Sequence, residues 1–252
     1  MPAALEALLT NLIDYAGLYP PAALPLKDVA EKYASYRTSA DGWMLNRVVL
    51  PLSKLAWTHF DEDWRISLLV DSEPGPLPHQ VETLETKLAL SLSRPTYCEV
   101  PLDQITDAFA KVRTGGLTPD AVPTPETIAD FLHRAAERRL PFKATAGLHH
   151  PMRSLRPLTY AADSPRAVMH GFLNVFLAAA FAWHGAARDL LVGVLQEEDP
   201  RAFEFRDDEL RWRGNRLTPD QMATARRDFA HSFGSCSFEE PVADLRDLGL
   251  LP

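Results

Sequence analysis

The sequence predicts one α/β domain over residues 1–252, a TIM-barrel-like (β/α)8 barrel. Short apolar runs rich in β-branched residues alternate with helical patterns, which favours parallel strands joined by crossover helices. The length of 252 residues suits a single barrel, and no repeat or low-complexity linker divides the chain. A doubly wound open sheet is the alternative.

Short runs rich in apolar and β-branched residues are expected to be buried strands. In chain order, these runs lie at residues 12–15, 47–50, 65–70, 96–100, 110–112, 142–145 and 229–233. The run at 142–145 is expected to be the sixth strand, and the seventh strand of the barrel has no candidate.

Helical patterns separate most of these runs, at residues 26–36, 79–92, 125–139 and 165–184. A Ser or Thr followed by Pro marks a helix start, because the side chain caps the first turn and proline lacks an N–H that would be unpaired there. Three such starts are predicted, at Thr124-Pro125, Ser164-Pro165 and Thr218-Pro219.

One segment departs from this alternation. Residues 203–213 alternate apolar and polar side chains around an Asp-Asp pair, which is typical of an antiparallel hairpin with one wet face. We expect this β-hairpin to be an excursion from the barrel.

The charge balance bears on partners and compartment. Lys and Arg number 26 against 34 Asp and Glu, so the net charge of −8 offers no basic footprint for nucleic acid or an anionic membrane. Two cysteines, Cys98 and Cys236, are too few for a disulfide framework, and no basic residue precedes the first apolar stretch as in a secretory signal. A soluble, cytoplasmic protein with no nucleic-acid or membrane partner is predicted.

Charged side chains at the ends of apolar strands need either a partner or a functional site. In a barrel, the carboxyl ends of the strands form that site. The catalytic candidates are Lys143, Glu99, His149 and His150. The substrate-binding candidates are Lys111, Arg113, Gly115, Gly116, Asp14, Ser235 and Ser237.

Lys143 lies between apolar neighbours in the run at 142–145. Desolvation and nearby cations such as Lys111 or Arg113 are expected to lower its pKa, and a neutral amine can form a Schiff base with a carbonyl group. The alternative is a buried ion pair with Glu99.

Lys111 and Arg113 share one face of their strand, and Gly115-Gly116 follows. An Arg fork and exposed backbone N–H groups suit a carboxylate or phosphate, so an anionic substrate is predicted. The alternative is that the two glycines only turn the chain.

The remaining candidates handle protons or contact substrate. Glu99 is a candidate general acid or base if its pKa is raised, and one of His149 and His150 is a candidate proton shuttle. Asp14 either orients a substrate hydroxyl or caps the following turn. Cys236, between Ser235 and Ser237, is expected to be a packed residue.

The segment Phe-Lys-Ala-Thr-Ala-Gly at 142–147 resembles the Lys-Thr-Ser-Thr-Gly strand of class I, Schiff-base aldolases of the deoxyribose-phosphate aldolase type. These are (β/α)8 barrels with the Schiff-base lysine on strand six. The resemblance covers one strand and implies that role for Lys143. The family's second lysine, in a Lys-Ala-Gly-Gly-like strand after the first, has no counterpart in this sequence; Lys111 instead precedes Lys143 by one βαβ unit.

The sequence thus predicts a lyase of aldolase-like type or an isomerase, acting on a small, polar, anionic carbonyl compound with no cofactor. One alternative is a lyase or hydrolase that uses a divalent metal held by Glu99, a histidine and Asp71. The other is a non-catalytic ligand-binding or assembly protein, in which the apolar helix at 165–184 joins the subunits of a homo-oligomer.

Overall fold

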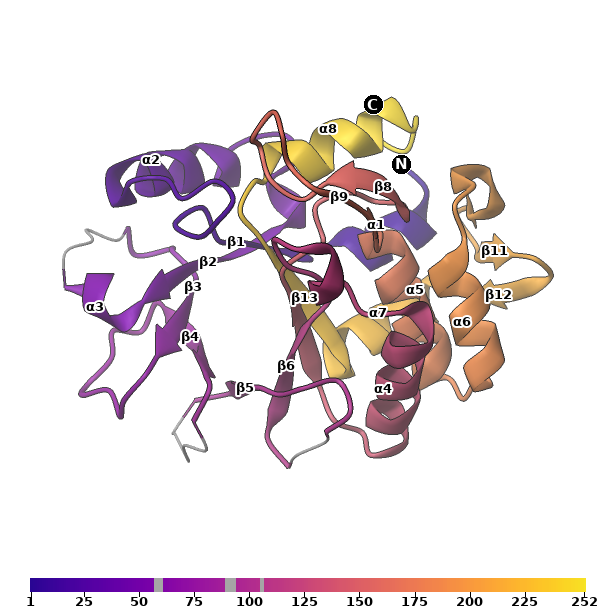
Figure 1. Cartoon of the computed structure of the whole chain (residues 1–252), viewed down its shortest axis with the longest axis horizontal. Helices are drawn as coiled ribbons and strands as arrows, with labels where there is room; N and C mark the ends of the chain where they lie inside the picture. Colours follow the sequence, from indigo (N-terminus) through magenta and orange to yellow (C-terminus); the bar gives the residue numbers. More distant parts are fainter. Residues whose placement is uncertain (57–60, 89–93, 105–106) are drawn as a thin grey trace.

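The predicted fold class is confirmed by the computed structural model, which describes residues 1–56, 61–88, 94–104 and 107–252. Eight parallel strands close a barrel in the order β1-β13-β7-β6-β5-β4-β3-β2 (Figure 1). The strands are β1 (Ile13–Tyr15), β2 (Leu45–Pro51), β3 (Ile66–Val70), β4 (Val81–Thr86), β5 (Thr96–Glu99), β6 (Phe109–Arg113), β7 (Phe142–Thr145) and β13 (Ala230–Ser235).

The helices are distributed unevenly around this barrel. They are α1 (Ala3–Leu9), α2 (Leu26–Arg37), α3 (Leu52–Leu55), α4 (Pro125–Glu137), α5 (Phe172–Trp183), α6 (Arg188–Gln196), α7 (Pro219–Asp228) and α8 (Glu239–Asp247). Helices α4 to α7 gather on one side, beside β6, β7 and β13, whereas the described segments around β3, β4 and β5 are short connections (Figure 1). The long connection from β7 to β13 supplies three of these four helices.

Two of the three predicted helix starts are confirmed. The side chain of Thr124 accepts a hydrogen bond from the backbone N–H of Thr127, and Thr218 forms a capping box with Gln221. The start at Ser164-Pro165 is wrong. Residues Arg166–Met169 form β9, which pairs with β8 (Ser154–Pro157) as an antiparallel hairpin, and α5 begins only at Phe172.

The predicted helix at 79–92 is wrong where the structure describes it, because Val81–Thr86 is strand β4. The spacing of Val81, Leu84 and Leu88 fits a helix. In the structure, Thr83 pairs with β3 and Glu85 pairs with both β3 and β5, so the segment is a strand. Residues 89–92 of that prediction lie outside the described residues. The missing strand is therefore the fourth, and Lys143 lies on the seventh strand of the barrel.

The hairpin predicted at 203–213 is confirmed and extended. Strands β10 (Glu204–Phe205), β11 (Leu210–Trp212) and β12 (Asn215–Leu217) form a separate three-stranded antiparallel sheet. Alternate residues of β11 are buried, as the period of two predicts.

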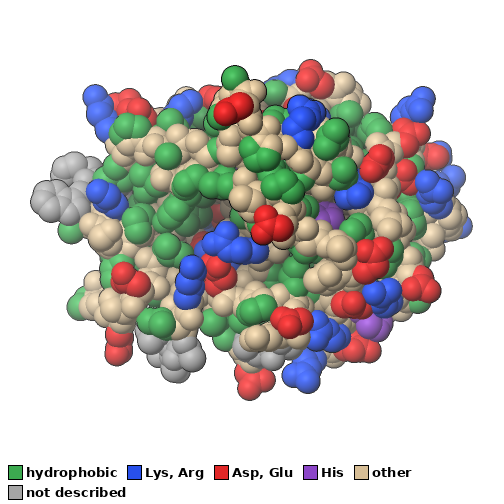
Figure 2. All heavy atoms as spheres, in the orientation of Figure 1, with side chains coloured by type: hydrophobic (Ala, Val, Ile, Leu, Met, Phe, Trp, Pro, Cys, Tyr) green, Lys and Arg blue, Asp and Glu red, His purple; other side chains and the backbone are tan. Residues whose placement is uncertain are grey.

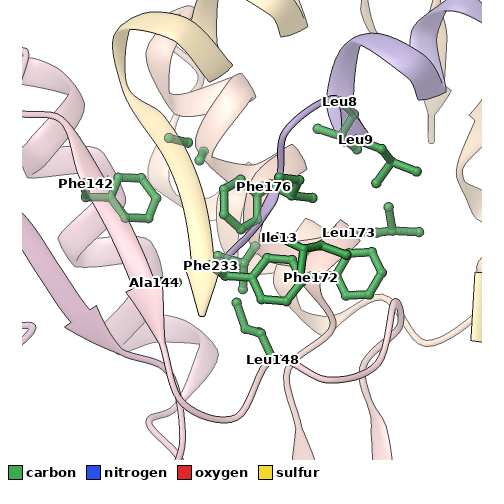
Figure 3. Close-up of a cluster of buried hydrophobic side chains, with 14 of the residues drawn as sticks. Leu8, Leu9, Ile13, Phe142, Ala144, Leu148, Phe172, Leu173, Phe176 and Phe233 are labelled. Atoms are coloured by element: carbon green, nitrogen blue, oxygen red, sulfur yellow. The ribbon is translucent and has the colours of Figure 1, made fainter. Parts of the chain in front are cut away.

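The core outside the barrel lies between α5 and strands β1, β7 and β13 (Figure 3). Phe172 stacks on Phe233 with ring centroids 5.2 Å apart, and Phe176 stacks on Phe142 at 6.3 Å. Every residue of α5 from Phe172 to Ala182 is buried, so the expectation that this helix offers an assembly surface is wrong. None of the helices in the described part of the chain is long and apolar enough to span a membrane.

The surface mixes charges of both signs. On the face shown in Figure 2, Lys and Arg side chains are interspersed with Asp and Glu side chains, and apolar groups lie between them near the centre.

Truncation of a ring in this core is the first test of the fold. Phe233 is fully buried, so Phe233→Ala is expected to lower the free energy of unfolding by about 3–5 kcal/mol in urea titrations. Leu155→Ala, at a side chain that is 55% exposed, is the control and should cost less than about 0.5 kcal/mol. Equal losses in the two variants would contradict the packing described here.

Candidate active site

A cavity of about 410 Å³ opens at the carboxyl ends of the barrel strands. Glu85, Glu99, Lys111, Arg113 and Lys143 all line it. These side chains come from four strands, β4, β5, β6 and β7, and parallel pairing brings the ends of those strands together. The structure therefore brings Lys111, Arg113, Glu99 and Lys143 to one pocket.

The charged side chains inside the barrel alternate in sign. We call them the ion-pair chain; in spatial order they are Asp14, Lys143, Glu85, Lys111, Glu99 and Arg113.

The inner half of the ion-pair chain is tightly bonded. Lys143 Nζ lies 2.5 Å from Asp14 Oδ2 and 2.5 Å from Glu85 Oε1, and Lys111 Nζ lies 2.8 Å from Glu85 Oε2. Glu85 thus bridges the two lysines. Buried charges are stable only when paired and hydrogen-bonded, and all four of these residues are buried.

Neutral hydroxyl and amide groups complete the bonding of the two inner carboxylates. Ser67 Oγ donates to Glu85 Oε1 at 2.6 Å, Ser232 Oγ donates to Asp14 Oδ2 at 2.7 Å, and Asn46 Nδ2 donates to Asp14 Oδ1 at 2.8 Å. These contacts explain why a barrel interior built from apolar strands contains small polar residues.

The pKa expected for Lys143 is wrong in direction. Burial by itself lowers the pKa of this amine, but the carboxylates of Asp14 and Glu85 outweigh burial and raise it above its usual value. Burial likewise raises the pKa of Glu85 by itself, yet Lys143 and Lys111 hold it well below its usual range. Lys143 is therefore an ammonium at neutral pH, and its ion-pair partners are Asp14 and Glu85, not Glu99 as the alternative supposed.

The outer half of the ion-pair chain reaches the solvent. Glu99 Oε1 lies 2.8 Å from Arg113 Nε, and Glu99 Oε2 lies 3.6 Å from Lys111 Nζ. Burial favours a raised pKa for Glu99, but the bond from Arg113 and the charge of Lys111 outweigh it, so the pKa is lowered. Glu99 is therefore a carboxylate at neutral pH, not the group with a raised pKa that was expected. The side chain of Arg113 is half exposed.

The two glycines after β6 are placed differently. A Cβ on Gly115 would lie 2.8 Å from the Cα of Gly147, so glycine here allows the loops after β6 and β7 to touch. Thr114 Oγ1 holds the same contact by donating to the carbonyl of Ala146 at 2.7 Å. Gly116 lines the cavity.

His149 and His150 diverge after β7. His149 lines the cavity, and burial, aided by the neighbouring His150, lowers its pKa to about 4. Its imidazole is thus neutral and can accept a proton. His150 faces α8 instead, with Nδ1 2.6 Å from Asp244 Oδ2.

The candidates at the end of β13 surround His149. Ser235 is fully buried, with Oγ 3.5 Å from His149 Nδ1, and Cys236 Sγ lies 3.9 Å from the same nitrogen. Cys236 is packed, as expected, and burial raises the pKa of its thiol. Ser237 Oγ accepts a hydrogen bond from the backbone N–H of Glu240, in the first turn of α8.

Asp14 takes neither of the roles expected for it. It is fully buried beneath Lys143 and belongs to the inner half of the ion-pair chain, away from the following turn.

Sequence reasoning missed several residues of the site, Glu85 and Tyr19 among them. Glu85 was hidden in the predicted helix at 79–92, although the β-branched residues of Val-Glu-Thr-Leu-Glu-Thr favour a strand. Tyr19 lines the cavity from the loop after β1, and its buried hydroxyl has no partner among the residues described. Its place directly before two prolines at the end of the first strand was the only signal.

The donor set of the metal alternative is not assembled. Glu99 and His149 both line the cavity, but Asp71 is exposed and does not line it. Within the described ranges, no three His, Cys, Asp or Glu side chains lie close enough together to hold a metal ion.

Comparison of the chain with protein-family models, curated proteins and solved structures finds no match. The fold described here therefore follows from strand order and register.

Removal of the innermost cation tests the ion-pair chain. Lys143→Met leaves Asp14 and Glu85 buried without the cation they share, so we expect a loss of about 3–5 kcal/mol in the free energy of unfolding at pH 7. The control is Lys27→Met, at an 83% exposed side chain, which should leave the unfolding free energy unchanged within error. A loss below about 1 kcal/mol for Lys143→Met would contradict the pairing.

The low pKa of His149 predicts a pH dependence. In the unfolded chain the imidazole binds a proton near pH 6.5, whereas in the folded protein it does so only near pH 4. Stability therefore falls as the pH drops below about 6.5, and His149 contributes a loss of about 1.5 kcal/mol between pH 6.5 and 5. In urea titrations at these two pH values, His149→Gln should lose about 1.5 kcal/mol less than the unmodified protein. Parallel losses would show that His149 is protonated in the folded state.

Proposed function

We propose that this protein is a lyase of the class I aldolase type, acting on a small anionic carbonyl compound. Lys111 forms the imine and Lys143 acts as an electrostatic catalyst in its ammonium form. The observation that carries the proposal is the placement of two lysines on neighbouring strands, bridged by Glu85 at the floor of the cavity.

The two lysines differ in their surroundings. Lys143 is 1% exposed and is held by two buried carboxylates that raise its pKa, so it cannot supply a free amine. Lys111 is nearer the cavity, at 7% exposure, and its partner Glu99 is itself engaged by Arg113.

Strand positions support the same assignment. In the aldolases that the 142–147 segment resembles, the Schiff-base lysine is on strand six and a second lysine is on the strand after it. Here Lys111 is on the sixth strand of the barrel, β6, and Lys143 is on the seventh, β7. The segment match places the Schiff-base role on Lys143, whereas the strand positions and the ammonium form of Lys143 favour Lys111.

The reaction follows from these placements. The Lys111 ammonium loses a proton to solvent in the cavity, and the amine so formed attacks the substrate carbonyl carbon. The carbinolamine hydroxyl takes up a proton and leaves as water, and an iminium ion remains. The bond between the α and β carbons breaks as the β-hydroxyl gives its proton to neutral His149, and the electron pair moves into the iminium to form an enamine. Protonation of the enamine carbon and hydrolysis then free Lys111.

The anionic part of the substrate is held at the mouth of the cavity. Arg113 is half exposed there, and the exposed Lys87 also lines the cavity. An Arg fork can bind a carboxylate or phosphate through two parallel hydrogen bonds. In an isomerase, the second candidate, neutral His149 would move a proton between the α carbon and the carbonyl carbon of the substrate through an enediol, and no carbon–carbon bond would break.

Reductive trapping tests this mechanism. The protein is incubated with pyruvate, acetaldehyde or glyceraldehyde 3-phosphate together with sodium cyanoborohydride, and the modified lysine is located by peptide mass spectrometry. We expect one dominant adduct, on the peptide that contains Lys111, and its loss in Lys111→Arg. Lys143→Arg keeps the positive charge and should slow adduct formation at least about tenfold without moving it.

The possible results separate the mechanisms. An adduct on Lys143 would reverse the roles of the two lysines. Adducts spread over surface lysines, or no adduct with any probe, would reject the imine.

A further inference from the structure

A second cavity, of about 620 Å³, lies at the opposite end of the barrel, between the starts of the strands and helices α1 and α7. Arg47, Arg65, Arg226 and Arg227 line it, and no carboxylate is among its lining residues in the described part of the chain. Such a basic cavity is unusual in a chain whose net charge is −8.

Two of these arginines share a single carboxylate. Glu82 accepts a hydrogen bond from Arg47 Nε at 2.8 Å and another from Arg65 Nε at 2.9 Å. One positive charge of this trio is therefore uncompensated. The side chain of Arg47 is 15% exposed and that of Arg65 is 36% exposed, so water screens the excess charge only in part.

Arg226 adds a second uncompensated charge. All five of its N–H groups donate to backbone carbonyls, those of Leu8, Thr10, Asn11, Ala230 and His231. No carboxylate of the described residues forms an ion pair with it. Burial lowers its pKa to about 9, which still leaves it charged at neutral pH. Arg227, in contrast, is neutralised by Asp228 at 2.8 Å.

Hydrogen-bond donors and an acceptor remain available in the cavity. Both Nη groups of Arg47 and Nη2 of Arg65 donate to none of the described residues. Asn46 lines the same cavity, is 5% exposed, and has a buried Oδ1 without a partner in the described ranges. Buried polar atoms are normally satisfied, so the free guanidinium donors indicate a ligand rich in acceptor oxygens. The Asn46 oxygen needs a donor on the same ligand, such as the remaining hydroxyl of a hydrogen phosphate dianion.

One wall of this cavity is aromatic. Tyr97 and Phe109 lie with ring centroids 5.7 Å apart, and both line the cavity. His231 is neutral, because burial and the charge of Arg226 lower its pKa to about 4. It accepts a hydrogen bond from the Tyr97 hydroxyl and donates one to the carbonyl of Arg227, so it adds no charge.

We propose that this cavity binds a phosphate group in its dianionic form, with Arg47 and Arg65 as its guanidinium donors. Two uncompensated positive charges match the two negative charges of phosphate, and planar guanidinium forks suit its oxygens. The volume exceeds that of the phosphate alone, and Phe109 offers an apolar surface to an attached organic group. The site is separate from the cavity at the carboxyl ends, and the proposal does not depend on the reaction proposed there.

Calorimetry at constant ionic strength, set with sodium chloride, tests the proposal with two probes, inorganic phosphate and phenyl phosphate. Saturable binding of either probe is expected. Equal affinities would indicate a site for free phosphate, and tighter binding of phenyl phosphate would indicate a phosphate monoester. Absence of saturable heat with both probes would overturn the proposal.

Variants locate the site and guard against misfolding. Arg65→Gln should weaken binding at least about tenfold, and Glu82→Gln should tighten it, a gain that an unfolded protein cannot show. Arg201→Gln, at an 88% exposed arginine away from both cavities, should change nothing. If Arg113→Gln abolished binding while Arg65→Gln left it unchanged, the phosphate would be bound at the other end of the barrel, and the proposal would be wrong.

Discussion

The bridge from Asp14 through Lys143 to Glu85 is the interaction on which the rest of this structure depends. A buried ammonium is stable in an apolar interior only when carboxylates and hydroxyls surround it. Its two carboxylates come from β1 and β4, which are three strands apart around the closed barrel. A shift of one residue in any of these strands would turn its charged side chain to the outer face, so the bridge fixes the register of the barrel.

The geometry of the candidate site follows from that register. Because Glu85 is held by Lys143 on one oxygen, its other oxygen is free to receive Lys111 from β6. Glu99 and Arg113 then continue the alternation toward the solvent. Each group is positioned by its neighbour in the ion-pair chain, and the two lysines acquire different environments because only one of them lies at the buried end.

The two ends of the barrel differ in net charge because cations and carboxylates balance at the carboxyl end and do not balance at the amino end. At the carboxyl end, the three cations of the ion-pair chain meet three carboxylates. At the amino end, Arg226 donates its hydrogen bonds to backbone carbonyls and forms no ion pair within the described ranges, and Glu82 pairs with two arginines. Asn46 connects the ends, since it hydrogen-bonds Asp14 and also lines the amino-end cavity. The buried carboxylate of Asp14 is thus bonded both to Lys143 of the ion-pair chain and to Asn46 of the amino-end cavity.

Local signals in the sequence determined much of the fold. Apolar runs located seven of the eight strands, the Thr-Pro pairs at 124 and 218 located two helix starts, and charged residues at strand ends gave Lys111, Arg113, Glu99 and Lys143. The tertiary structure decided the rest. Val-Glu-Thr-Leu-Glu-Thr satisfies both a helical and a strand pattern, and pairing with β3 and β5 selects the strand. The ionisation of Lys143 depends on carboxylates 129 and 58 residues away in the chain, which no local pattern contains. A pKa is set by distances in space, and those exist only once the barrel has closed.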